Sequence, residues 1–186
     1  MKGDAMRGSR NPFWLVFALI ATMIAGLDTP SFSATSSERE TLHGVEALNV
    51  LVRVKTQDAG ARSLGITQEK LQKDLEETLT TAGIKVAPNA RPYLLLSVSM
   101  ISISHPRIDG ILAYVYTAQL KFRQGAIIDS TGTRATATTW DEIRFGASSP
   151  TKNLDSRIRK SIKALVSSFV NDYLTANSAK GLGNKD

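Results

Sequence analysis

Few residues in this sequence are of the types that perform nucleophilic or acid-base catalysis. The chain contains two histidines, His43 and His105, and no cysteine. A cysteine-histidine pair is therefore excluded, and a Ser-His-Asp arrangement would need the histidine in the turn before Pro106. Adjacent acidic residues occur at Glu76-Glu77 and Asp141-Glu142, but neighbours on a helix or strand point in different directions. We therefore expect a protein that is not an enzyme, and a hydrolase using scattered polar groups is the less favoured alternative.

The sequence also lacks the patterns that bind metals, cofactors and nucleic acid. No group of histidine and acidic residues has the spacing of zinc ligands, and the glycines match no phosphate-binding motif. The formal net charge of +6 at pH 7 is spread along the chain and does not form a basic run. We expect no metal, no cofactor and no nucleic-acid partner.

The first 34 residues have the three-part plan of a secretory signal peptide. A basic head with Lys2, Arg7 and Arg10 precedes an apolar run over 13–26. Small residues lie near two candidate cleavage points, after Ser33, which we favour, and after Ala34. The run is shorter than the roughly 20 apolar residues of a spanning helix. We expect an exported protein, periplasmic or extracellular, with no membrane span once the signal is cleaved. The alternative is an inner-membrane anchor formed by an uncleaved N-terminal helix.

The rest of the chain divides into one domain with a polar segment at each end. We predict a signal peptide over 1–34, a mobile mature N-terminus over 35–44, a single domain over 45–177 and a polar tail over 178–186. The absence of cysteine excludes disulfides and a lipid-modified N-terminal cysteine. Stability must therefore come from an ordinary hydrophobic core, for which a domain of this length is sufficient.

Hydrophobic spacing predicts the element order β-α-β-β-β-α. Alternating apolar residues indicate four strands, over 45–54, 93–104, 113–124 and 134–145. Thr67 suits the N-cap of a helix that Gly83 would end, and apolar spacing from Ile158 to Leu174 predicts a long amphipathic helix. Consecutive strands joined by short turns pair antiparallel. We predict an α+β fold, a two-layer α/β sandwich with a largely antiparallel sheet and both helices on one face.

A binding patch is predicted on the outer face of this sheet. We interpret the last strand as having four residues under the helices, Ala135, Ala137, Ile143 and Phe145. The predicted patch on the opposite face comprises Trp140, Lys121, Arg123 and Arg144. An exposed aromatic side chain among polar strand residues is typical of a binding surface. The alternative is the opposite register, because a one-residue slip moves every side chain to the other face.

A second candidate is basic and lies at the start of the final helix. It comprises Arg157, Arg159, Lys160 and Lys163. Such a group could bind an acidic partner or anionic lipid, and the alternative is a solubilising polar face. The expected partner is therefore another envelope protein or an acidic surface.

Four segments carry a resemblance to known proteins: Ile84–Val86, Tyr93–Val98, Ala137–Trp140 and Phe169–Asn177. Through them the chain resembles an uncharacterised group of small exported bacterial proteins over most of 45–177. The element order is also similar to envelope assembly and transport-accessory lipoproteins, including the one that plugs the lipopolysaccharide translocon. Those proteins carry a lipidated cysteine, which this chain lacks. The resemblance implies an exported accessory module with no defined chemistry.

Overall fold

The computed structural model describes residues 34–56, 65–105, 108–149 and 153–178. The predicted signal peptide, except its last residue, and the predicted tail beyond residue 178 lie outside these residues. The elements are α2 (Ser36–Glu40), β1 (Asn49–Thr56), α4 (Gln68–Thr81), β2 (Tyr93–His105), β3 (Ile108–Ile128), β4 (Thr133–Ser148) and α5 (Leu154–Ser178). No helix within the described ranges is both long and apolar enough to cross a membrane.

The strands form one mixed sheet in the order β1-β2-β3-β4. β1 pairs parallel with β2, because α4 carries the chain back between them. β2 pairs antiparallel with β3, and β3 pairs antiparallel with β4. The predicted α+β class is confirmed, because the described residues form a four-stranded mixed sheet with three helices.

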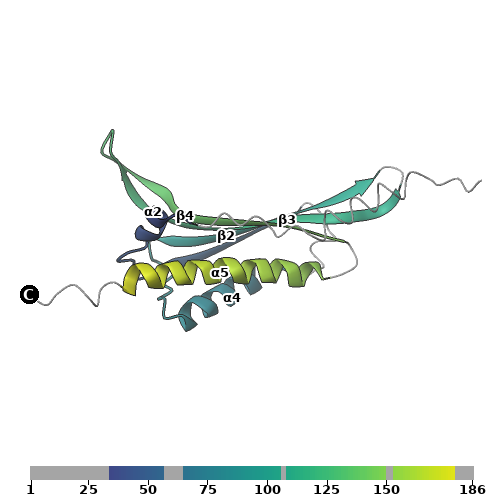
Figure 1. Ribbon diagram of the computed structural model, residues 1–186, viewed down its shortest axis with the longest axis horizontal. Coiled ribbons are helices and arrows are strands. Elements are labelled where there is room, and N and C mark those ends of the chain that lie inside the picture. The colour runs from purple at the N-terminus through teal and green to yellow at the C-terminus, as the bar shows by residue number, and fades with distance from the viewer. Residues whose placement is uncertain (1–33, 57–64, 106–107, 150–152, 179–186) are drawn as a thin grey trace, which may run out of the picture. The chain divides into compact units, whose positions relative to one another are not determined.

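The two longer helices pack on the sheet and on each other. Thr67 caps α4 by accepting a hydrogen bond from the Lys70 amide, and Gly83 follows the helix with φ of 82°. α4 contacts β1, α5 contacts β3 and β4, and the two helices touch. Figure 1 shows α5 running along the sheet beside α4.

The core forms from one set of alternating strand residues together with the apolar stripes of the helices. It includes Val50 and Val52 of β1, Leu96 of β2, Phe122 of β3 and Phe169 of α5, all at most 3% exposed. Strand side chains at the intervening positions point away from this cluster.

Residues 35–44, which we expected to lie outside the folded domain, contain a helix that precedes β1. Thr35 caps α2 with a capping box, in which the Thr35 amide donates to Glu38 Oε2 at 2.6 Å and the Thr35 hydroxyl accepts from the Glu38 amide. Leu42, just after the helix, is fully buried in the core. Within the described residues, the element order therefore begins with a helix that the sequence prediction lacks.

A β-bulge in β4 reverses which alternating side chains of the strand face the core. The predicted outward orientation of Trp140 is wrong for this reason. Phe122 pairs with Trp140, whereas the next residue, Arg123, pairs with Thr138, so Thr139 is one residue too many. An extra residue moves every later side chain to the opposite face. Trp140 is consequently 0% exposed. The same shift turns Arg144 toward the core side, and it turns Ile143 and Phe145 outward.

Candidate functional site

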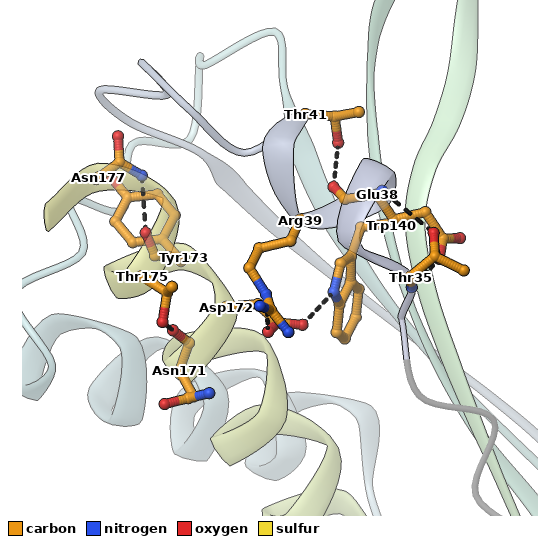
Figure 2. Close-up of polar contacts among 10 residues, drawn as sticks. All are labelled: Thr35, Glu38, Arg39, Thr41, Trp140, Asn171, Asp172, Tyr173, Thr175 and Asn177. Atoms are coloured by element: carbon orange, nitrogen blue, oxygen red, sulfur yellow. Dashed lines mark hydrogen bonds and ion pairs between the residues drawn. The ribbon is translucent and has the colours of Figure 1, made fainter. Parts of the chain in front are cut away.

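Trp140 anchors β4 to the C-terminal half of α5 (Figure 2). Its ring meets Phe169 edge-on, with 5.1 Å between the ring centroids. Its Nε1 donates a hydrogen bond of 2.9 Å to Oδ2 of Asp172, which is only 5% exposed. Asp172 lies three residues after Phe169, so both side chains leave the helix on the face that meets the sheet.

The second carboxylate oxygen of Asp172 binds the N-terminal helix. Arg39 of α2 donates from Nε to Oδ1 at 2.8 Å, and Figure 2 shows the guanidinium and the Trp140 indole on either side of the carboxylate. Both oxygens of this buried carboxylate are therefore hydrogen-bonded, as a buried charge requires. The cluster joins α2, β4 and α5, and its geometry fits a structural role.

The end of α5 holds the chain that follows α2. His43 Nδ1 lies 2.9 Å from the Ala176 carbonyl oxygen, and the side chain of Asn177 bonds both the Leu42 carbonyl and the Gly44 amide. The hydroxyl of Tyr173 donates to the carbonyl of Val45. These contacts close off one end of the domain.

Alkaline pH should destabilise the domain through Tyr173. Burial raises the pKa of the Tyr173 hydroxyl above its ordinary value of 10.0. Above that value the unfolded chain binds fewer protons than the folded one, so the stability contribution, complete below about pH 10, is lost as the pH rises through the folded-state pKa. Urea unfolding between about pH 8 and pH 11 should show a smaller alkaline loss for Tyr173→Phe than for the wild type. Parallel pH profiles would contradict this prediction.

The four residues of the predicted sheet patch lie on different faces. Lys121 and Arg123 of β3 are half-buried on the outer face, opposite the buried Leu120 and Phe122 that flank them in sequence. Arg123 donates from Nη1 to the Tyr93 hydroxyl at 2.9 Å and lies over its ring.

Arg144 belongs to the core side and is already paired within β4. It donates from Nη2 to Oε1 of Glu142 at 2.9 Å, and Glu142 is 1% exposed. The structure therefore does not bring Trp140 and Arg144 together with Lys121 and Arg123, and the binding roles of these residues stay predictions.

Two of the four basic residues at the start of α5 form hydrogen bonds or ion pairs with other residues of the domain. Arg157 donates to the Ala147 carbonyl at 3.1 Å, and Arg159 bonds Asp155 at 2.8 Å and Asp74 of α4 at 3.1 Å. Lys160 and Lys163 are exposed, and neither forms an ion pair within the part of the chain that the structure describes.

The outer face of the sheet carries further side chains that the sequence analysis did not select. Arg53 and Lys55 of β1 are exposed there, alternating with the core residues Val52 and Val54. The alternation of basic and apolar residues in β1 is a sequence signal that could have placed Arg53 and Lys55 on the outer face. A second missed residue, Asp172, was visible in the sequence as an acidic position three residues after Phe169 in an apolar stripe.

Few of the described residues are candidates for metal binding or catalysis. Among the described residues, no group of three or more histidine or acidic side chains could hold a metal ion. His43 is exposed and bonded to a backbone carbonyl. The side chain of His105 lies outside what the structure describes.

No family model and no curated protein matches this chain. The PelC dodecamer from Paraburkholderia phytofirmans is 18% identical, over 75% of this chain and 94% of that chain, with a TM-score of 0.41. Rare lipoprotein B from Shewanella oneidensis is 12% identical over 69% and 93%, with a TM-score of 0.27. Lipoprotein GNA1162 from Neisseria meningitidis is 13% identical over 67% and 98%, with a TM-score of 0.34. The expected distant similarity to lipoproteins, without a characterised family, is confirmed.

Proposed function

We propose that this chain is an exported, non-enzymatic interaction module that binds a partner through the outer face of its sheet. The observation that carries the proposal is the exposure of large apolar side chains there: Leu51 is 38%, Ile101 47% and Phe145 39% exposed. These three side chains lie on different strands of one face, and exposed apolar surface on a soluble protein often marks a site of protein interaction. Both long helices pack on the other face in this proposal, so α4 and α5 leave the outer face open.

The contacts of the buried Asp172 carboxylate support a structural role for it over a catalytic one. The carboxylate of Asp172 is occupied by Trp140 and Arg39. A catalytic group must instead be able to reach a reacting atom and exchange a proton with it. In this proposal, the polar network keeps a rigid sheet in place and the sheet contacts the partner.

The N-terminal sequence supports export. Cleavage after Ser33 would leave Thr35 and Glu38 in the chain, so the capping box of α2 and the Arg39–Asp172 ion pair would survive processing. The proposed mature protein therefore begins directly before its first helix.

Export is tested by the N-terminal sequence and intact mass of the protein recovered from periplasmic, membrane and medium fractions of its host. We expect a chain that begins at Ala34 in a soluble fraction. Ser33→Phe should block this processing, because signal cleavage needs a small residue at that position. The matched control, Ser36→Phe, changes an exposed residue of α2 and should be processed normally. A full-length wild-type chain in the membrane fraction would contradict the proposal and make residues 13–26 an anchor.

A further inference from the structure

We infer that the outer face docks an acidic segment of a partner protein. This inference rests on the function proposed above and adds the chemistry of the partner. The surface concerned, called the outer-face patch, comprises three rows of paired strand residues: Leu51, Leu95, Lys121 and Asp141; Arg53, Ser97, Gln119 and Ile143; Lys55, Ser99, Thr117 and Phe145.

The charge of the outer-face patch is positive and incompletely balanced. Arg53 and Lys55 are exposed and Lys121 is half-buried, and none of the three forms an ion pair with a described residue. Asp141 is the one acidic residue of the three rows, and its Oδ2 already accepts a 3.1 Å hydrogen bond from Gln119. Carboxylates from a partner would therefore meet three basic groups and a single acid.

The other residues of the outer-face patch suit a polypeptide. Apolar side chains lie on the two edge strands, at Leu51 on β1 and at Ile143 and Phe145 on β4. Hydroxyl groups of Ser97 and Ser99 lie on β2 between them. Basic, apolar and hydrogen-bonding groups on one surface complement a segment that alternates acidic and apolar side chains.

Two other occupants fit this surface less well. A second copy of this protein that docked through the same surface would place two basic faces against each other. Like charges repel across such an interface. Each basic residue near an anionic membrane strengthens the binding of a protein only about fivefold. Three such residues therefore strengthen it on the order of a hundredfold. Clusters that bind anionic lipid contain about four to eight basic residues, more than the outer-face patch offers.

The basic start of α5 provides a control surface of the same charge. Arg157 and Arg159 are used within the fold, which leaves the exposed Lys160 and Lys163. The docking inference thus predicts different effects for two equal changes of charge. Arg53→Glu with Lys121→Glu alters the outer-face patch, and Lys160→Glu with Lys163→Glu alters the helix.

The test is a titration of the ¹⁵N-labelled protein, purified as its host produces it, with poly-L-glutamate followed by NMR. We expect the amide shifts to concentrate in β1, β2 and β3, and the outer-face double variant to bind at least about tenfold more weakly. The helix double variant should change affinity by less than about twofold. Circular dichroism must show that both double variants unfold under the same conditions as the wild type. If one of them does not, the titration is repeated with the corresponding single substitutions.

Each other outcome overturns the inference. Shifts centred on the start of α5, equal losses in the two double variants, or no binding would all exclude the outer-face patch as the acidic-segment site. Binding to phosphatidylglycerol vesicles that is stronger than binding to poly-L-glutamate, and is lost in the outer-face variant, would assign the surface to a membrane. All these results leave export and the absence of catalysis untouched, because those are decided by the N-terminal sequence and by assays of turnover.

Discussion

Trp140→Ala is expected to lower the free energy of unfolding by about 4 kcal/mol, the range found when large aromatic side chains are removed from a core. The Trp140 side chain is completely buried, and its ring packs edge-on against Phe169. The substitution creates a cavity between β4 and α5, and it also removes a donor from the buried carboxylate of Asp172. Urea denaturation followed by circular dichroism measures the loss.

Trp140→Phe separates the two contributions. The phenyl ring keeps much of the packing but has no N–H, so one carboxylate oxygen of Asp172 loses its donor, at a cost of about 1–3 kcal/mol. Leu51→Ala is the surface control, because this residue is 38% exposed on the other face, and it should cost below about 1 kcal/mol. If Trp140→Ala were as stable as Leu51→Ala, Trp140 would not be a core residue of the protein in solution.

Local signals predicted the secondary structure well because they act within a few residues. The Thr67 cap and the Gly83 stop both operate where expected. The alternation of β3 also placed its buried residues correctly, since large apolar side chains such as Leu120 and Phe122 fit only one face. Elements with strong amphipathic patterns are thus specified by their own sequence.

The bulge in β4 could not be predicted in this way. The residues before it, Ala135 to Thr139, are small or β-branched and suit either face. Thr139 is fixed from elsewhere: its carbonyl accepts from the Thr41 hydroxyl at 3.0 Å, and its own hydroxyl accepts from Gln124 Nε2 at 3.0 Å. Because the first contact joins residues far apart in sequence, extending the pattern of Ala135 and Ala137 past the bulge inverted the assignment of Trp140.

The contacts that the candidate site residues make within the fold could not be predicted for a related reason. The composition of a charged cluster does not reveal which of its residues form contacts within the domain. Arg157 and Arg159 do so, by donating hydrogen bonds to the Ala147 carbonyl and to Asp155. Residues 35–44 were assigned to a polar end, although Arg39 pairs with Asp172 and Leu42 is buried in the core. In both cases the decisive partners are distant in sequence. The outer-face patch became visible only when the register of four strands was known.

Gly146→Ala should lower the free energy of unfolding by about 2 kcal/mol, although it adds a single methyl group. Gly146 pairs directly with Tyr116, and a Cβ atom there would overlap Cζ and Oη of the Tyr116 ring. The ring cannot easily move away, because Tyr116 is 4% exposed and its hydroxyl is hydrogen-bonded to Ser161 Oγ at 3.0 Å.

The matched control is Gly125→Ala in β3, where no atom lies near the added Cβ. Its stability should be within about 0.5 kcal/mol of the wild type. In a Tyr116→Leu background, Gly146→Ala should cost much less, since the overlapping ring is gone. Equal stabilities of the two glycine variants in the wild-type background would show that Tyr116 does not lie across Gly146.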